Sequence, residues 1–351
     1  MYIKPSGKEE YNQLNKMKQE FMNSRKDLLP SNYWILVNEK NISQLKQHGY
    51  KNFKRTLALN YYTWIIRSIK VWEDDQMKFL LSNISKLSII KNLICAFVTN
   101  FTNKFIKSFL KRYLYNFLVF MLWSYTKKLD KDNLLKRINE PIEGNPPRIY
   151  KKKKIISQDL SNSILEYYSI TENLDKKEIK SIMELGAGYG RTAFVFLKLM
   201  PGIKYIIIDI PPALYVAERY LSNQFSEKKV FKFRSFKNYL EIKEEFEQAD
   251  IAFFLPSQLE LLPPKISNLF INISSFHEMR PNQIQYYFDC IDRLITKLIY
   301  IKQWKVSENY YDKLTILEKD YPIKDNWKKR FWRECKVKTQ FFESLLEIEN
   351  K

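Results

Sequence analysis

Cysteine and histidine are scarce in this sequence of 351 residues, which holds three cysteines and two histidines. The cysteines, Cys95, Cys290 and Cys335, are odd in number and far apart, so they predict neither a disulfide framework nor a zinc site. A metal site built from several histidines is excluded as well, because His48 and His277 are the only two. We therefore expect a protein of a reducing compartment without a metal centre.

Long apolar segments are also missing. The first residues contain no apolar stretch of the kind that forms a secretory signal. The uncharged run at 113–126 has 14 residues, whereas a helix that crosses a bilayer needs roughly 18–20. We interpret this run as a buried helix, with a helix lying on a membrane surface as the alternative. The expected localisation is cytoplasmic, either free or attached peripherally to the inner face of the membrane.

Acidic residues are few in the first half of the chain. The whole sequence has 59 Lys and Arg against 39 Asp and Glu, a formal net charge of +20. Residues 1–156 carry 30 basic and 12 acidic side chains, so +18 of the net charge lies there and residues 157–351 carry the remaining +2. Such an excess indicates a basic face for an anionic lipid, a nucleic acid or a phosphorylated substrate. The alternative is an AT-rich coding bias that favours lysine.

A Gly-Asn-Pro-Pro stretch at 144–147 marks a break between two parts of the chain, because these residue types stop helices. Before the break, apolar residues recur at helical spacing in 57–69 and 101–109, which predicts a basic, mostly helical N-terminal region. The predicted units are this N-terminal region at 1–140, a linker at 141–156 and a second domain at 157–351.

Short apolar stretches alternate with helical patterns after the break, which predicts a parallel sheet with helices on its faces. Pro281 opens a helix whose apolar stripe extends to Ile295. A last strand at 337–342 is expected to run antiparallel at the edge of the sheet. The other expected strands are 181–185, 205–210, 230–233, 251–255, 269–274 and 298–304, and the other expected helices are 192–199, 213–222 and 239–247.

Glycine is scarce too, yet three of the seven glycines lie in one loop, Glu184-Leu-Gly-Ala-Gly-Tyr-Gly190, between a strand and a helix. Glycines there let the backbone turn sharply and approach a ligand closely. The G-x-G-x-G spacing of Gly186, Gly188 and Gly190 differs from the G-x-G-x-x-G of nicotinamide enzymes and is typical of S-adenosylmethionine (SAM) methyltransferases. We expect this loop, with Ala187 in it, to bind SAM.

Polar side chains near this loop complete the predicted cofactor site. Glu184 precedes the first glycine by two positions and can hold the ammonium-bearing methionine tail of SAM, directly or through water. Asp209 ends the second strand, where a carboxylate can accept hydrogen bonds from both ribose hydroxyls. Ser257 and Gln258 follow the strand at 251–255 and are placed to contact the adenine edge, with a surface turn as the alternative.

Several stretches resemble the SAM-dependent sugar O-methyltransferases of bacterial polysaccharide and deoxysugar pathways. The matching stretches are 156–163, 183–191, 208–215, 271–279, 302–304 and 341–343. The Ser-Phe-His-Glu-Met element at 275–279 is the part most specific to that family, whereas the glycine loop is shared by SAM enzymes at large. The resemblance covers roughly residues 140–345. It implies an α/β fold, a class I (Rossmann-like) SAM methyltransferase sheet preceded by the basic helical region, and a sugar hydroxyl as the methyl acceptor.

The Ser-Phe-His-Glu-Met element places His277 and Glu278 just after the expected strand 269–274. Ligands of open α/β sheets bind outside the carboxyl ends of the strands, so both side chains are expected beside the cofactor. A sugar hydroxyl needs a base that accepts its proton, and a neutral imidazole suits that task. His277 is the predicted base, and Glu278 orients it, binds a hydroxyl or is itself the base. Local capping of the backbone is the structural alternative for both residues.

Weaker candidates follow along the chain. Lys302 could hold a phosphate of the acceptor and Trp304 could stack on a sugar face, with ordinary packing as the alternative for each. The other histidine, His48, lies in a basic helical segment and is predicted to be structural or at the surface. The Asp130-Lys-Asp132 triplet resembles the metal-holding D-x-D of nucleotide-sugar transferases, but its flanking lysines argue against a metal site.

The sequence thus predicts transfer of a methyl group from SAM to a hydroxyl of a sugar or glycan precursor. The expected partner is a sugar-containing acceptor, which is anionic if it is nucleotide- or lipid-linked, and the basic N-terminal half could contact a membrane. Two other functions stay open: an RNA methyltransferase, and a non-catalytic membrane-associated scaffold with a degenerate SAM fold. Nucleic acid is the less favoured partner, because no aromatic and basic RNA-binding module is recognisable.

Overall fold

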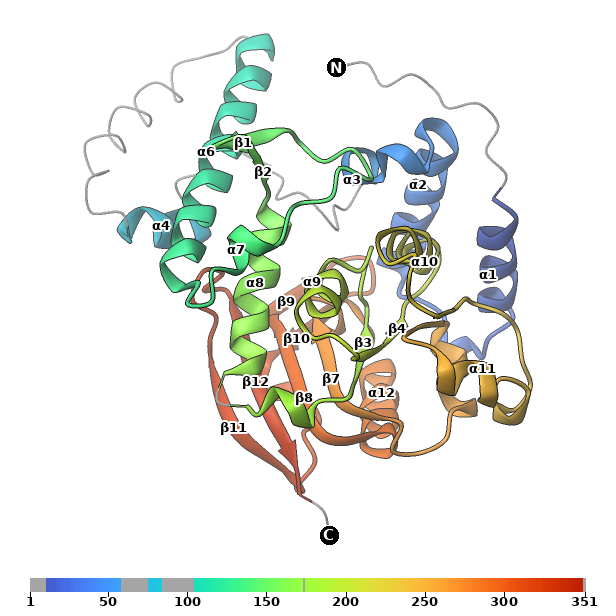
Figure 1. Cartoon of the computed structure of the whole chain (residues 1–351). Helices are drawn as coiled ribbons and strands as arrows, with labels where there is room; N and C mark the ends of the chain where they lie inside the picture. The colour runs from blue at the N-terminus through green and yellow to red at the C-terminus, as the bar shows by residue number, and fades with distance from the viewer. Residues whose placement is uncertain (1–10, 58–74, 84–103, 173, 350–351) are drawn as a thin grey trace.

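The computed structural model describes residues 11–57, 75–83, 104–172 and 174–349 of the chain. The helical spacing predicted at 57–69 and the residue Cys95 lie outside the described residues, apart from Leu57. One large sheet forms the centre of the described part, and helices cover both of its faces (Figure 1).

Eight strands form the central sheet, in the spatial order β11-β12-β8-β7-β3-β4-β6-β5. The six strands from β5 to β8 in this order run parallel to one another, and β12 and β11 are antiparallel additions beside β8. Their bounds are β3 (Ser181–Leu185), β4 (Lys204–Ile208), β5 (Val230–Phe231), β6 (Ile251–Phe254), β7 (Ser267–Ile273), β8 (Ile295–Trp304), β11 (Trp327–Glu334) and β12 (Phe341–Ile348).

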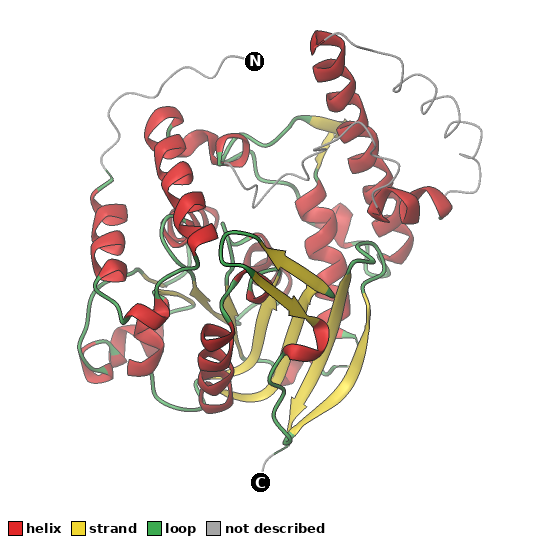
Figure 2. Cartoon of the chain, turned by 180° about the vertical axis from the view of Figure 1, so that it is seen from behind, coloured by secondary structure: helices red, strands yellow, loops and turns green. Residues whose placement is uncertain are grey.

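The parallel strands are apolar on both sides because helices bury each face of the sheet. Alternate side chains of β3 point to opposite faces, so Ile182 packs in one apolar cluster and Met183 in another. The first cluster contains α8 (Gln158–Thr171), α9 (Arg191–Leu199) and α10 (Ala213–Gln224), and the second contains α11 (Lys243–Gln248) and α12 (Pro281–Leu294). Seen from behind, α12 lies in front of the strands (Figure 2).

This arrangement confirms the expected fold class, a Rossmann-like class I methyltransferase sheet. The glycine loop follows β3, and the chain switches direction around this central strand, with β4 on one side and β7 on the other. In such sheets the switch point at the carboxyl ends is where ligands bind.

The basic N-terminal half is helical, as expected, and its helices pack against the sheet domain. Leu14 and Phe21 of one helix and Leu45 of the next belong to the same apolar cluster as Tyr220 of α10. The predicted division at 141–156 stays a prediction, and a hairpin lies within it. The elements of this half are α1 (Asn12–Met22), α2 (Asn32–His48), α3 (Phe53–Thr56), α4 (Asp75–Ser82), α6 (Lys104–Leu129), α7 (Leu134–Arg137) and the hairpin of β1 (Ile149–Lys151) and β2 (Lys154–Ile156).

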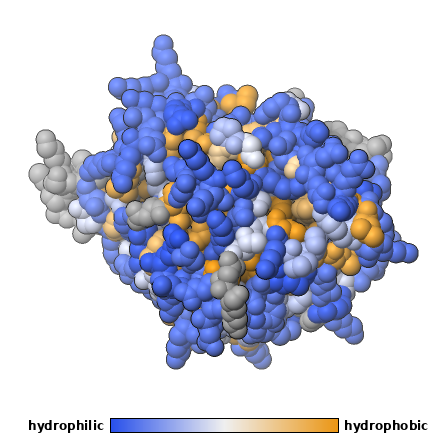
Figure 3. Space-filling view, turned by 60° about the horizontal axis from the view of Figure 1, so that its bottom comes forward, coloured by the Kyte–Doolittle hydropathy of each residue, from blue (hydrophilic) through white to orange (hydrophobic). Residues whose placement is uncertain are grey.

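The uncharged run 113–126 lies within α6, which has 26 residues. Leu118, Leu122 and Trp123 are buried, which confirms the buried-helix interpretation for this part of the run, whereas Tyr113 and Phe120 are exposed. None of the helices in the described ranges is long and apolar enough to cross a membrane. The face in Figure 3 is covered mainly by hydrophilic residues, with small apolar patches between them.

Two expectations about secondary structure were wrong, and two further elements were not predicted. The last strand, expected at 337–342, is β12, and it lies second from the edge with β11 outside it. Five of the eight residues of β11, Trp-Lys-Lys-Arg-Phe-Trp-Arg-Glu, are Lys, Arg or Glu, so no apolar alternation marks this stretch as a strand. Ile295 opens β8 and does not extend the stripe of α12. The hairpin of β9 (Val306–Asn309) and β10 (Leu314–Leu317) was not predicted.

Candidate active site

The parallel register brings the predicted site residues to one edge of the sheet. Gly186 follows β3 and Asp209 follows β4, while His277 lies in the short 3-10 helix η7 (Phe276–Glu278) after β7. Trp304 ends β8, which pairs with β7 in parallel. These residues all lie at carboxyl ends of neighbouring strands, where the sheet leaves room for ligands.

The glycine loop needs its glycines for two separate reasons. Gly186, Gly188 and Gly190 have φ angles of +74°, +62° and +86°, a region that residues with a Cβ rarely adopt. A Cβ on Gly186 would also lie 2.3 Å from Ser275 Oγ, so glycine lets the loop after β7 approach the glycine loop. Ala187 is buried in the same turn. The residues after β7 are thereby held against the predicted cofactor loop.

The Asp209 carboxyl is held by two backbone N–H groups, one of which belongs to the glycine loop. Gly188 N–H donates to its Oδ2 and Ile210 N–H donates to its Oδ1, each at 2.7 Å. The carboxyl is only 8% exposed, and burial raises the pKa of Asp209 to about 7 in spite of these hydrogen bonds. Its remaining lone pairs can accept hydrogen bonds from a ligand that lies on the loop, as the ribose role requires.

Glu184 lies within β3 and is almost completely buried. The hydroxyl of Tyr205 donates to Glu184 Oε2 at 2.7 Å, and burial raises the pKa of Glu184 to about 7. The carboxyl therefore already has a partner on the neighbouring strand. Its predicted contact with the methionine tail stays a prediction.

A buried ion-pair network joins the glycine loop to α8 and β8. Arg191 Nη1 lies 2.5 Å from Glu166 Oε2, and Lys302 Nζ lies 3.0 Å from Glu166 Oε1. The two cations lower the pKa of Glu166 to about 2, although burial acts in the opposite direction. Lys302, predicted to hold a phosphate, thus has a protein carboxylate beside it, which argues against that role. Glu166 and Arg191 were not predicted as site residues, although Arg191 directly follows the last glycine of the loop.

The imidazole of His277 is oriented by Gln303, another residue that was not predicted. Gln303 Oε1 accepts from the backbone N–H groups of Ser275 and His277, at 3.2 and 3.3 Å, and its Nε2 donates to Asn272. These partners determine which end of the amide is oxygen, so His277 Nδ1, 2.9 Å from Oε1, carries a proton. In the neutral ring the lone pair is then on Nε2, which makes Nε2 the basic atom.

Glu278 lies between two other side chains of the site. Its Oε1 is 3.6 Å from His277 Nε2, and its Oε2 accepts a hydrogen bond from Trp34 Nε1 at 3.0 Å. The Trp304 ring lies 6.0 Å from the His277 ring and 4.9 Å from the Phe341 ring, measured between centroids. The structure therefore brings His277, Glu278 and Trp304 together as predicted, and it adds Trp34 and Phe341 to them.

Ser257 and Gln258 lie in the 3-10 helix η6 (Pro256–Leu261), which follows β6 beside β4. Gln258 is buried, its Oε1 accepts from Leu255 N–H and its Nε2 donates to the carbonyl of Arg234, both at 2.9 Å. Both ends of this amide hold the loop in place. A contact of Ser257 or Gln258 with adenine stays a prediction.

The two residues of the D-x-D triplet do not form a metal site with other residues. Asp130 accepts hydrogen bonds from the N–H groups of Leu134 and Leu135 at the start of α7, and from the hydroxyl of Tyr168. Among the described residues, no group of three or more His, Cys, Asp or Glu side chains could hold a metal ion. His48 lies in the last turn of α2, far along the chain from the site.

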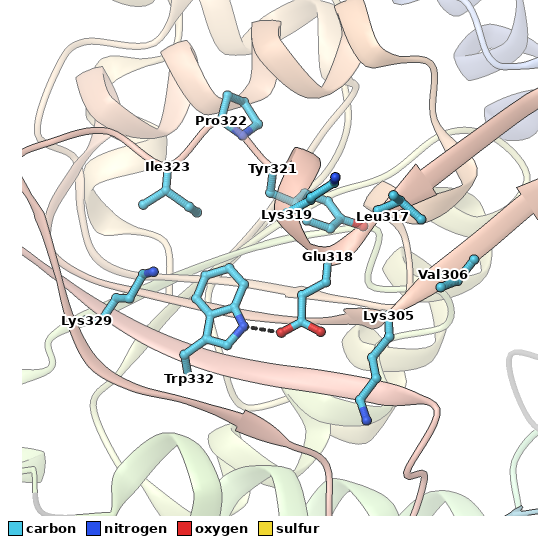
Figure 4. A pocket seen from close by; sticks show the side chains of 10 residues that line it. All are labelled: Lys305, Val306, Leu317, Glu318, Lys319, Tyr321, Pro322, Ile323, Lys329 and Trp332. Carbon is cyan, nitrogen blue, oxygen red and sulfur yellow. Dashed lines mark hydrogen bonds between the residues drawn. The ribbon is translucent and has the colours of Figure 1, made fainter.

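A groove of about 800 Å³ lies outside this site, between β9–β10, η8 (Glu318–Asp320) and β11 (Figure 4). Trp332 lines it and donates its indole N–H to Glu318. One face of the Trp332 ring stacks on Phe342 at 4.9 Å, and Lys329 Nζ lies 4.8 Å from the ring centroid. Because the ring already has these neighbours and none of the predicted site residues lines the groove, we do not assign it to the active site.

No protein-family model and no curated protein matches the sequence. Among solved structures, the mitomycin 7-O-methyltransferase MmcR matches at 10% identity and a TM-score of 0.38, over 54% of this chain and 55% of that chain. A SAM-dependent methyltransferase from Aquifex aeolicus matches at 14% identity and a TM-score of 0.32, over 64% and 98%. The 1,6-didemethyltoxoflavin-N1-methyltransferase of Burkholderia thailandensis, whose structure holds S-adenosylhomocysteine, matches at 11% identity and a TM-score of 0.38, over 55% and 79%. The match spans about half the length of MmcR.

Similarity this low carries no conclusion about activity, so the fold assignment depends on the strand order and the glycine loop. The cofactor that this arrangement fits is SAM. The glycine loop follows the end of β3 with three residues at positive φ, and Gly188 N–H holds the Asp209 carboxyl beside it, where this carboxyl can accept hydrogen bonds from ribose hydroxyls. The spacing of the glycines does not match the pyrophosphate-binding loop of nicotinamide enzymes.

Proposed function

We propose that this protein is a SAM-dependent O-methyltransferase whose acceptor is a hydroxyl of a sugar or glycan precursor. The observation that carries the proposal is the orientation of His277, whose Nδ1 is held by Gln303 so that Nε2 carries the lone pair. This basic atom lies on the loop that Ser275 packs against the glycine loop. A base at that position suits an oxygen acceptor, because a hydroxyl must lose its proton as the bond to methyl forms.

When bound, SAM supplies an electrophilic methyl group on a sulfonium. The chain's own residues position the acceptor and move its proton. The acceptor hydroxyl donates its one proton to His277 Nε2, and a neighbouring hydroxyl of the same sugar donates to Glu278 Oε1, which lies 3.6 Å from Nε2. His277 Nε2 accepts the hydroxyl proton, and the Glu278 carboxylate then stabilises the imidazolium. Burial of His277 excludes water and strengthens these interactions.

The side chains around His277 support a sugar as the acceptor. Trp304 is half-buried, so part of its ring is accessible beside the base, and Phe341 supports it from the next strand. A sugar has an apolar face that fits an aromatic ring and hydroxyls that fit Glu278.

Lys338 supports an anionic form of the acceptor. Its Nζ lies 5.2 Å from the centroid of Phe341, the ring that packs beside His277. Burial, together with the charges of Lys302 and Arg191, lowers the pKa of Lys338 to about 8. An anion such as a nucleotide or a lipid-linked pyrophosphate would offset this excess of positive charge. Contact of the basic N-terminal half with an anionic membrane belongs to the same proposal.

Two measurements test the proposal. Calorimetric titration with S-adenosylhomocysteine should show binding at one site, and binding of NADH in its place would overturn the cofactor. Transfer of a labelled methyl group from SAM should then be measured with a mixture of nucleotide sugars and, separately, with RNA. Labelled sugar products would support the proposal, whereas labelled RNA would favour the alternative RNA methyltransferase. Binding without transfer to either would favour the scaffold.

A further inference from the structure

We propose that the N-terminal segment forms a wall of the acceptor side of the site, and that Trp34 is a positioning residue for Glu278. The inference rests on the proposed function, because it assigns the same site an additional residue. Trp34 lies in the first turn of α2 and is 244 positions away from Glu278 in the sequence. Its role follows from three sets of contacts.

The first set attaches the chain just before α2 to α12. Arg280 Nη2 and Gln283 Nε2 both donate to the carbonyl of Leu29, at 2.7 and 2.8 Å. Arg25 forms an ion pair with Glu260 of η6 at 2.8 Å. The segment before α2 is therefore held by hydrogen bonds and an ion pair to elements that follow β6 and β7, on the carboxyl side of the sheet.

The second set fixes the start of α2 to the β9–β10 hairpin. Asp312 accepts from the backbone N–H groups of Asn32 and Tyr33, at 3.0 and 3.3 Å, in the first turn of the helix. A carboxylate there satisfies N–H groups that have no partner within the helix, and it interacts favourably with the helix dipole. The rings of Tyr33 and Tyr311 also pack together, with centroids 5.8 Å apart. The position of Trp34 is thus determined on both sides of the helix start.

The third contact is the hydrogen bond from Trp34 Nε1 to Glu278 Oε2, at 3.0 Å. Glu278 is 23% exposed, and its other oxygen lies 3.6 Å from His277 Nε2. With one oxygen held by the indole, the carboxylate has one orientation in which the other oxygen lies beside the base. Without the indole, the Glu278 side chain has more rotamers open to it, and its free oxygen no longer has a fixed place beside the base from which to hold the acceptor.

The test compares Trp34→Phe with the matched variant Trp332→Phe. Both substitutions remove an indole that donates to a glutamate, but Trp332 donates to Glu318 in the groove described above. Trp34→Phe should lower kcat/KM for the nucleotide-sugar mixture by about tenfold or more, because hydrogen bonds to charged groups contribute about 1.5–3 kcal/mol. The dissociation constant of S-adenosylhomocysteine should stay within about twofold in both variants. Trp332→Phe should keep the kcat/KM of the wild-type protein.

A spectroscopic measurement separates this role from a merely structural one. In ¹⁵N-resolved NMR spectra the indole N–H signal of Trp34 should move when Glu278→Gln removes the charge of its acceptor, while the signal of Trp332 should not. An unmoved Trp34 signal, or wild-type kcat/KM in a folded Trp34→Phe protein, would overturn the inference. Failure of the wild-type protein to bind S-adenosylhomocysteine would instead overturn the proposed function.

Discussion

Gln303 Oε1 lies 2.9 Å from His277 Nδ1, and this contact determines which nitrogen of the ring can act as a base. Gln303 is itself oriented by two backbone N–H groups and by Asn272. The tautomer of His277 therefore follows from backbone geometry at the ends of β7 and β8, and not from the acceptor.

Substitution of His277 should affect turnover and leave cofactor binding intact. His277→Ala is expected to lower kcat by about 10²–10⁴-fold, the usual contribution of a general base. The dissociation constant of S-adenosylhomocysteine should remain unchanged, because the proposed function places the ring on the acceptor side. His48→Gln changes the other histidine of the chain and serves as the control. If Glu278→Gln abolishes turnover while His277→Ala keeps most of it, the carboxylate is the base.

The affinity for S-adenosylhomocysteine should rise with pH through Asp209. The pKa of this carboxyl is about 7 because of burial, and hydrogen bonds from ribose hydroxyls need the ionised form. Affinity should therefore increase between pH 6 and pH 8 in the wild-type protein. In Asp209→Asn the affinity should be weaker and should lack this increase. Because the ligand titrates in the same way with both proteins, the difference between the two calorimetric series reports Asp209 alone. Parallel pH dependences in both proteins would contradict the assignment.

The same pKa has a consequence for stability without ligand. Asp209 keeps its proton in the folded state up to about pH 7, whereas its pKa in the unfolded chain is near the model-compound value of 3.8. The folded state binds more protons in this window, so the contribution of Asp209 to the free energy of unfolding falls as pH rises from about 4 to about 7. Urea denaturation of the wild-type protein and Asp209→Asn over this range measures the contribution, which the variant should lack.

Removal of the shared counter-charge of Arg191 and Lys302 should be strongly destabilising. Glu166→Gln leaves the buried Lys302 and the partly buried Arg191 without a full partner, and breaking a buried ion pair typically costs about 3–5 kcal/mol. Glu334→Gln is a suitable control, because its partner Lys305 is at the surface, where such pairs contribute about 0–1 kcal/mol. Urea denaturation measures the free energy of unfolding of both variants. Equal decreases in the two variants would contradict this expectation.

Alanine substitutions at Gly186 and Gly202 distinguish the effect of a steric clash from the effect of backbone strain. Both have positive φ, +74° and +79°, but a Cβ on Gly186 would meet Ser275 Oγ at 2.3 Å while one on Gly202 would meet nothing within 4 Å. Gly186→Ala should therefore abolish binding of S-adenosylhomocysteine, because the loop after β7 must move away. Gly202→Ala should bind it as the wild-type protein does. Calorimetric titration of both folded variants with S-adenosylhomocysteine measures this difference in binding.

Local patterns in the sequence were sufficient for the glycine loop, most strands of the sheet and the two-residue candidate His277–Glu278. Strand β3 was predicted with the bounds that it has, because a short apolar run that ends at a glycine cluster is typical of a buried strand followed by a turn. The strand β11 was not predicted, because an edge strand with a solvent-exposed face needs no apolar pattern. Lys302 was interpreted as a ligand contact because its partner Glu166 lies 136 positions earlier, on a different element.

The type of fold and the cofactor loop could be predicted from local patterns, because hydrophobic periodicity and glycine spacing act over a few residues. Which side chains surround the predicted base depends on contacts between distant segments. Gln303, Trp34 and Phe341 come from β8, α2 and β12, and their contacts with the turn at η7 exist because the sheet and the N-terminal helices bring distant segments together. Such contacts depend on packing and not on neighbouring residues, so no local pattern in the sequence could reveal them.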